Sequence, residues 1–401
     1  MWNEERMAMK CVSALSTLSD STAALDDVLA RVRPAFGGEA GGPSASDLAI
    51  LFGSAHHAPA FGVIARTIRE SGLARVVVGC TAESIVGDGL EVEGEPALAL
   101  WAARLPGVTL RPFRLDYDGS EVQGGEGLAE GPEGRSLLLL ADPFSFPTDV
   151  YLKELRTRAP ALPVFGGMAS ASRTPRGNRI ILGGEVYQDG AVAVEISGAL
   201  RVRTVVSQGC RPIGRPMIVT RAERNIIREI GRRPALEVLR ETFEGLSPED
   251  QELVQEGLHI GRVINEYQES FHRGDFLVRN VLGADDSGGI AITDVIRVGQ
   301  TIQFHVRDAA SADEDLLSLL ERDRQSRPDS KVVGGLLFTC NGRGTRLFPG
   351  PNHDAEMIQR LYGPMPVAGF FAMGEIGPVG GQNFVHGYTA SLALFERPAP
   401  E

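Results

Sequence analysis

A unit of strand, helix and strand occurs three times along the 401-residue chain, and this repetition constrains the fold more than any other feature. In each copy the second strand ends in a template of an apolar residue, Val, any residue, Gly, any two residues and Ala, as in "VVVGCTA", "PVFGGMA" and "PVAGFFA". Such a unit normally joins two parallel strands, and buried parallel strands are apolar on both faces, as "SLLLLAD" is. The segments predicted for strand, helix and strand are 48–54, 60–71 and 76–82 in the first copy, 136–142, 148–158 and 163–169 in the second, and 335–341, 354–362 and 366–372 in the third.

Antiparallel signals separate these copies. Residues 178–209 break into three predicted strands at turns rich in Gly, and residues 274–308 do the same, while residues from 221 to about 258 favour helix. We therefore predict an α/β fold with two related lobes, each mixing crossover units with an antiparallel meander. The predicted domains are a strand, helix and Gly/Pro loop in residues 1–45, a first lobe in 46–232 and a second in 233–396.

Composition and charge exclude several classes of partner. The net charge of −12 argues against nucleic acid or an anionic membrane surface, since both require clustered positive charge. The four cysteines form no CxxC pair, which favours reduced thiols over disulfides or structural zinc. The amino terminus leads into no apolar run, so we expect no signal peptide, and no stretch approaches the roughly 18 apolar residues of a membrane span. These features predict a soluble protein of the cytoplasm.

The carboxyl ends of parallel strands are where α/β proteins bind ligands. The glycine-rich strand ends of the three copies, with the polar residues beside them, therefore predict the walls of a pocket. A single glycine at such a place more often serves only to let backbone segments approach closely, so both interpretations stay open. The candidate ligand-binding residues are Gly79, Cys80, Thr81, Glu83, Gly166, Gly167, Cys340, Asn341, Arg343, Gly374, Glu375 and His386.

Two chemistries are open to the charged and thiol groups at these ends. Arg343, between two glycines, would hold a carboxylate or phosphate, or else form an internal ion pair with Glu375. Cys340 or Cys80 would serve as a nucleophile with His386 as base, or else be a small buried thiol. No His, Cys, Asp or Glu spacing predicts a metal site or a catalytic triad.

The segment from 210 to 235 carries seven arginines within 26 residues, "CRPIGRPMIVTRAERNIIREIGRRPA". It would face an acidic partner, or else be the solvated face of a helix whose arginines pair with Glu223 and Glu229.

Motifs along nearly the whole chain, from about Met9 to Phe395, resemble those of the FIST family. They are "GCTAES", "FGGMAS", "VSQGCRPIG" with "VTRAERNIIREIGRRPALEVL", "LLFTCNGRGTRLF", and "GFFAMGEIGP" with "HGYTASLALF". The resemblance implies an intracellular sensory protein with an amino-terminal and a carboxy-terminal FIST domain. Amino acids have been proposed as ligands for the family, and some relatives bind haem and respond to nitric oxide.

The resemblance, together with the strand ends, predicts a cytoplasmic module that binds a small ligand and acts in signal transduction. No kinase, cyclase, methyl-accepting or F-box segment follows Phe395, so a separate signalling protein would supply the output. The alternatives are an enzyme with a cysteine nucleophile, a haem-based gas sensor whose ligating histidine the motifs do not identify, and a scaffold without a ligand.

Overall fold

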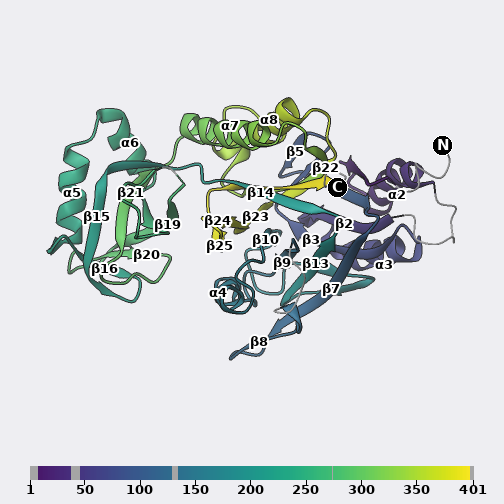
Figure 1. Ribbon diagram of the computed structural model, residues 1–401, viewed down its shortest axis with the longest axis horizontal. Coiled ribbons are helices and arrows are strands. Elements are labelled where there is room, and N and C mark those ends of the chain that lie inside the picture. Colours follow the sequence, from purple (N-terminus) through teal and green to yellow (C-terminus); the bar gives the residue numbers. More distant parts are fainter. Residues whose placement is uncertain (1–7, 38–45, 129–133, 273, 398–401) are drawn as a thin grey trace. The chain divides into compact units, whose positions relative to one another are not determined.

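The computed structural model describes residues 8–37, 46–128, 134–272 and 274–397, which form two compact units (Figure 1). Unit 1 combines the chain up to Val206 with the chain from Leu317 onward, and unit 2 is Ser207–Leu316. Most of the predicted Gly/Pro loop, residues 38–45, lies outside the described residues. The predicted α/β fold in two lobes is confirmed. No helix in the described part of the chain has the length and apolar character that crossing a membrane requires.

All three predicted crossover units are confirmed, and all three lie in unit 1. In each, two strands joined by a helix pair in parallel: β2 with β3, β9 with β10, and β22 with β23. The predicted amino-terminal strand and helix are confirmed as well, and Asp20 caps the helix by accepting a 2.8 Å hydrogen bond from the Ala23 backbone N–H.

Unit 1 consists of three repeats, and repeats 1 and 3 have the same order of elements, whereas repeat 2 has the short strand β8 where the other two have their first helix. Repeat 1 has β1 (Lys10–Ser16), α2 (Ser21–Val32), β2 (Ser46–Ser54), α3 (Phe61–Glu70), β3 (Ala74–Ala82), β4 (Ser84–Gly87), β5 (Leu90–Glu93) and β6 (Leu98–Arg104). Repeat 2 has β7 (Val108–Tyr117), β8 (Val122–Gln123), β9 (Ser136–Ala141), α4 (Thr148–Arg158), β10 (Val164–Met168), β11 (Ile180–Leu182), β12 (Glu185–Tyr187) and β13 (Ala191–Gly198). Repeat 3 has β14 (Arg201–Ser207), α7 (Ala309–Ser326), β22 (Lys331–Cys340), α8 (His353–Tyr362), β23 (Val367–Ala372), β24 (Glu375–Val379), β25 (Gln382–His386) and β26 (Ala390–Arg397), with unit 2 inserted after β14.

The three sheets of unit 1 share one strand order, and each is completed by a hairpin from another repeat. The orders are β1-β6-β2-β3-β11-β12, β7-β13-β9-β10-β24-β25 with β8 at its edge, and β14-β26-β22-β23-β4-β5. Repeat 1 thus gives its hairpin β4–β5 to repeat 3, repeat 2 gives β11–β12 to repeat 1, and repeat 3 gives β24–β25 to repeat 2. The exchange closes a cycle. It also corrects the predicted meander in residues 178–209, because β11 pairs with β3, β13 with β7 and β9, and β14 with β26, all outside that segment. The described pairing inside the segment is that of β11 with β12.

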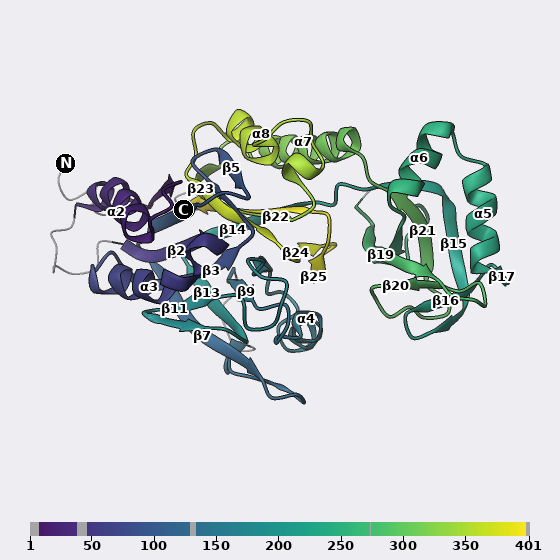
Figure 2. The same cartoon turned by 180° about the vertical axis from the view of Figure 1, so that it is seen from behind.

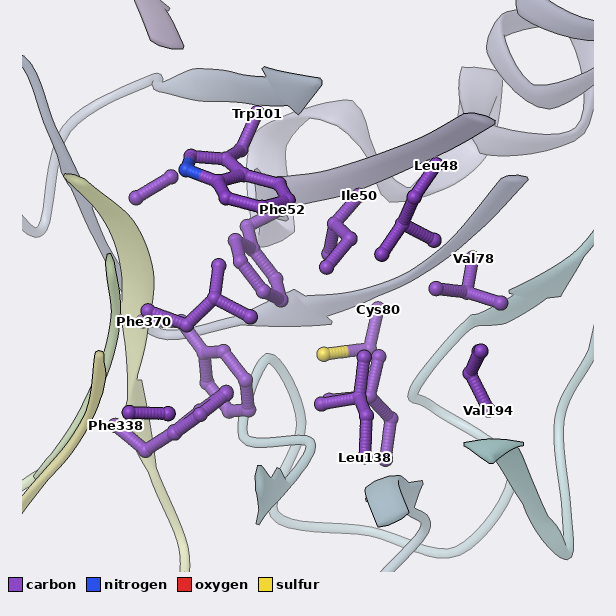
Figure 3. Close-up of a cluster of buried hydrophobic side chains, with 14 of the residues drawn as sticks. Leu48, Ile50, Phe52, Val78, Cys80, Trp101, Leu138, Val194, Phe338 and Phe370 are labelled. Atoms are coloured by element: carbon purple, nitrogen blue, oxygen red, sulfur yellow. The ribbon is translucent and has the colours of Figure 1, made fainter. Parts of the chain in front are cut away.

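The space between the three sheets is a packed apolar core. Alternation along each strand sends Leu48, Ile50 and Phe52 of β2 into this core and Ala49 and Leu51 to the outer face. Helices α2 and α3 cover that outer face, and Figures 1 and 2 show them beside β2 and β3. Figure 3 shows side chains of all three repeats meeting inside, with the ring centroids of Phe52 and Phe370 5.1 Å apart. The space between the sheets is thus filled by side chains, as the alternative of a scaffold without a ligand would also have it.

Unit 2 is antiparallel throughout its described strands. These are β15 (Arg211–Glu223), β16 (Ile226–Ile230), β17 (Arg233–Pro234), β18 (His259–Val263), β19 (Phe276–Ala284), β20 (Ile290–Ile292) and β21 (Thr301–Val306), with helices α5 (Ala235–Glu244) and α6 (Pro248–Glu256). The long β15 pairs with β21 at its start and with β16 at its end, so six strands close into a barrel. The predicted helix from residue 221 is wrong for its first part, because Arg224 adopts a left-handed conformation (φ 54°) that turns the chain into a hairpin.

Candidate functional site

The three template glycines face the backbone of the neighbouring parallel strand. A Cβ atom at each of them would lie within 2.1 Å of a carbonyl oxygen on the strand before it, far closer than any contact allows. The close approach that glycine permits at these three strand ends is therefore to the chain's own backbone. The three pairs and their Cβ-to-oxygen distances are Gly79 and Leu51 (2.1 Å), Gly166 and Leu139 (1.9 Å), and Gly369 and Leu337 (1.8 Å).

The other two glycines of the predicted site also make room for protein atoms. A Cβ at Gly374 would lie 2.2 Å from Met168 Cε, and one at Gly167 would lie 3.1 Å from the side chain of Ala372. Gly167 pairs with Glu375 between β10 and β24. These glycines serve the contact between repeats 2 and 3.

Cys80 belongs to the apolar core. Its side chain has no solvent exposure and points toward Leu138 and its neighbours (Figure 3). Burial raises the pKa of this thiol far above its ordinary value, so it stays protonated. Of the two thiols predicted as nucleophiles, Cys80 is thus excluded by its surroundings. Cys340, at the end of β22, is partly exposed, and the Gly342 N–H lies 3.4 Å from its sulfur.

The carboxyl ends of the parallel strands do meet, and Ser170 joins all three repeats there. The Ser170 hydroxyl donates a hydrogen bond to the Phe371 carbonyl of repeat 3 and accepts one of 2.9 Å from the Glu83 N–H of repeat 1. The Ser170 N–H donates to the Thr81 carbonyl at 3.3 Å. We call the group formed by Thr81, Glu83, Ser170, Asn341 and Arg346 the strand-end junction. Three of its hydrogen bonds, all made by Ser170, connect segments that are distant in sequence.

An exposed ion pair lies on the solvent side of this junction. The Arg346 guanidinium contacts the Glu83 carboxylate and donates a 2.6 Å hydrogen bond to the Asn341 carbonyl. Half of the Arg346 side chain and a quarter of the Glu83 side chain are exposed. Sequence reasoning named Thr81, Glu83 and Asn341 but missed Arg346. The signal for Arg346 was its place three residues after Arg343 in the polar segment "CNGRGTR".

Arg343 pairs with Asp354 and not with Glu375, which corrects the predicted internal ion pair. Its Nε and Nη2 donate bidentate 2.7 Å hydrogen bonds to the two Asp354 oxygens at the start of α8, and Thr339 Oγ1 donates a third of 2.7 Å. Both charged side chains are buried, and the guanidinium lies 5.1 Å from the centroid of the Phe348 ring. Arg343 therefore fixes α8 to the end of β22 inside the protein.

A second carboxyl group lies beside this pair. Glu91, on the hairpin that repeat 1 gives to repeat 3, accepts a 2.9 Å hydrogen bond from the Ala355 N–H and is 5% exposed. Burial and the nearby Asp354 carboxylate raise the pKa of Glu91 to about 8. Glu91 is therefore protonated in the folded protein at neutral pH.

This raised pKa predicts that stability falls as pH rises from about 5 to about 8. In that window the unfolded chain ionises Glu91, whose ordinary pKa is 4.5, while the folded protein keeps the proton, at a cost of up to about 1.4 kcal/mol per pH unit. Urea unfolding of wild type and Glu91→Gln at pH 5 and pH 8 measures the effect as a difference between the two proteins, in which the contributions of other titrating groups cancel. A difference between the two proteins that is the same at both pH values would contradict the prediction.

Glu375 and His386 face each other across β24 and β25. The Glu375 carboxylate is buried and accepts hydrogen bonds from the Thr389 N–H (3.0 Å) and hydroxyl (2.7 Å). Thr389 in turn accepts a 2.9 Å hydrogen bond from the Cys340 N–H through its carbonyl. The His386 ring lies 2.9 Å from the Gly377 carbonyl. This network ties the end of β22 to the exchanged hairpin of repeat 3.

Neither a cluster of metal ligands among the described residues nor a histidine in the two cavities of unit 2 points to a metal or haem site. Within these residues no group of three or more His, Cys, Asp and Glu side chains stands close enough to hold a metal ion. The two cavities described in unit 2 have no histidine in their linings, so they supply no axial ligand for haem iron.

Comparisons with known proteins agree with the sequence motifs. The FIST N domain matches residues 47–233 and the FIST C domain matches residues 235–378. An uncharacterised protein of Mycobacterium tuberculosis (strain H37Rv) is 44% identical over 394 residues, which cover 96% of this chain and 100% of that protein. An uncharacterised protein of Mycobacterium bovis is 42% identical over 394 residues, covering 96% and 99%.

A plant protein matches part of the chain. An F-box/LRR-repeat protein of Arabidopsis thaliana is 32% identical over 100 residues, which cover 24% of this chain and 19% of that protein. FIST domains are in general sensory domains of signal-transduction proteins. Both domain matches occur in order, and the mycobacterial relatives align over almost their full length. The chain therefore belongs to the FIST family.

Proposed function

We propose that the chain is a sensory module that binds a free amino acid at the strand-end junction and passes the signal to a separate partner protein. One observation carries this proposal: a partly exposed carboxylate of repeat 1 and an exposed guanidinium of repeat 3 stand together where all three repeats meet. An amino acid presents the complementary pair of charges, an ammonium for Glu83 and a carboxylate for Arg346.

Separating Glu83 from Arg346 costs little free energy. Exposed ion pairs contribute about 0–1 kcal/mol, so a ligand that replaces both partners loses little by separating them. Arg346 is already oriented by its bond to the Asn341 carbonyl, and a guanidinium binds a carboxylate through two parallel hydrogen bonds. The junction can thus exchange an internal contact for a ligand without disturbing the buried Arg343–Asp354 pair.

Binding at this place would change how the strand ends of the repeats are arranged against one another. The junction joins the repeats through Ser170 and through the Glu83–Arg346 pair, so a ligand that separates Glu83 from Arg346 favours one arrangement of the strand ends over another. A partner that recognises that arrangement would read the presence of the ligand. The partner supplies the output, which accords with the sensory role of FIST domains in general.

The expected result is that one or a few of the twenty amino acids raise the melting temperature of the wild-type protein and bind in isothermal titration calorimetry. Glu83→Gln and Arg346→Gln should each weaken binding at least about tenfold, because each removes one charge-assisted contact. Arg158→Gln, in the exposed pair with Glu154 on α4, is the matched control and should bind as wild type does. Absence of binding to all twenty, or equal binding by the two junction variants and wild type, would overturn the proposal.

A further inference from the structure

A groove of about 790 Å³ lies on unit 2 between β15 and α5, which run side by side in Figures 1 and 2. Its floor is apolar and its rim is charged. Open grooves of this size and lining bind ligands or peptide segments. The apolar lining residues include Met217, Ile218, Ile230, Val238 and Leu246, and the charged ones are Arg215, Arg233 and Glu241.

A bulge in β15 shapes one wall of the groove. The pairing of β15 with β21 shifts between Ile213 and Met217, so that residues 214–216 stand opposite the single residue Gln303. Gly214 adopts a left-handed conformation (φ 62°), and its carbonyl accepts a 3.0 Å hydrogen bond from the Gln303 side chain. Arg215 and Pro216 have no partner residue in the described strand pairing. This part of β15 is therefore an open strand edge beside a hollow.

The charges on the rim favour an anion. Arg233 is balanced by Glu237 and Glu241, which contact it at 2.6 and 2.5 Å. Arg215 is exposed, and among the described residues its side chain has no hydrogen-bond or ion-pair partner. The chain as a whole carries a net charge of −12. Arg215 is thus a local positive charge, beside an apolar hollow, on a protein that is negative overall.

An exposed apolar side chain lies at the mouth of the groove. Ile218, on the same strand three residues after Arg215, is 54% exposed and lines the hollow. A partner that covers Ile218 removes this apolar area from water, whereas a free anion held by Arg215 leaves it exposed. The spacing of a cation and an apolar side chain along one strand edge suits an extended chain that carries an acid and an apolar residue.

We propose that this groove binds an extended peptide segment of a partner protein, with a carboxylate on Arg215 and an apolar side chain against Ile218 and the groove floor. The segment lies along the bulged edge of β15 and reaches toward α5. An acidic partner for the arginine-rich segment is one of the two interpretations that the sequence leaves open. Here that contact is assigned to Arg215 and to this groove. This inference does not depend on the amino acid site, because all of its residues belong to unit 2.

The test is a selection of random decapeptides displayed on phage, using the full-length protein and counter-selecting with the double variant Arg215→Glu, Ile218→Asp. Selected peptides should carry an acidic residue close to an apolar one. In fluorescence anisotropy, labelled copies of these peptides should bind the wild type and lose at least about tenfold in affinity to Arg215→Glu and to Ile218→Asp separately, since each variant removes one contact.

Arg224→Glu is the matched control. Arg224 is exposed, its side chain also has no ion-pair partner among the described residues, and it lies at the opposite end of the β15–β16 hairpin from the groove. It should leave peptide binding unchanged. All variants change exposed side chains, and circular dichroism checks that each is folded. The proposal is overturned if no peptide distinguishes wild type from the double variant, if selected peptides lack acidic residues, or if sedimentation shows that the groove variants abolish self-association, which would make a second copy the occupant.

Discussion

Replacing Gly369 with alanine should abolish cooperative folding of unit 1 or destabilise it by more than about 3 kcal/mol. The new Cβ would lie 1.8 Å from the Leu337 carbonyl oxygen, and the obstructing atom is backbone in the centre of a sheet. Relief requires β22 and β23 to separate, which would break hydrogen bonds on both sides. Gly166→Ala should have a comparable effect, increased by the positive φ of 145° at that residue.

Soluble yield and thermal melting followed by circular dichroism measure this effect. Gly350→Ala is the control, because a Cβ there would meet no atom within 4 Å and the residue is exposed. The template glycines serve either the close approach of two backbone segments or a ligand, and these two explanations predict different results. If Gly369→Ala melted like wild type and lost only ligand binding, the glycine would be serving a ligand, and the backbone explanation would fail.

Replacing Asp354 with alanine should destabilise the protein by about 3–5 kcal/mol, because it leaves the Arg343 guanidinium charged and buried without its partner. Arg343 has no solvent exposure, and its Nη1 has no hydrogen-bond partner among the described residues even in the wild type. Glu91, the acid that remains beside Arg343, is protonated at neutral pH and would have to ionise inside the protein to replace the lost charge. Urea unfolding at neutral pH gives the change in free energy of unfolding.

Two companion variants separate charge burial from lost packing. Glu154→Ala breaks an exposed ion pair with Arg158 in α4 and should change stability by less than about 0.5 kcal/mol. The double variant Arg343→Met, Asp354→Leu removes both buried charges and should be more stable than Asp354→Ala alone. If the double variant is less stable than the single one, the loss in Asp354→Ala comes from packing and not from the unpaired charge.

The crossover units of the fold could be predicted because their signal is local. Four consecutive leucines in β9 alternate between the inner core and the helix-covered face, so a fully apolar run already indicates a strand buried on both sides. The helix expected after residue 221 failed for a local reason too. Ile226, Ile227 and Ile230 have the spacing of a helix face, but the left-handed turn at Arg224 and the β-branched residues favour a hairpin.

The candidate site was less predictable because its contacts are distant in sequence. The strand ends were named correctly as a meeting place, yet the partner of Glu83 lies 263 residues away, and no periodicity encodes that distance. Arg343 was predicted at the right strand end with the wrong acid, since Asp354 lies on the first turn of the following helix, whose orientation the sequence does not specify. Short exchanged hairpins such as β11–β12, with three residues in each strand, are too short for their sequence to indicate which sheet they join.

The cycle of exchanged hairpins determines where this protein can be divided. Deleting any one repeat would deprive a second repeat of its sheet edge and leave the hairpin of the third without a sheet to join. Fragments that contain one or two repeats thus lack a complete folding domain, and we expect unit 1 to fold only when all three repeats are present. Unit 2 differs: Ser207 at its start and Asp315 near its end are joined by a 2.7 Å hydrogen bond, so the chain enters and leaves this unit at neighbouring points.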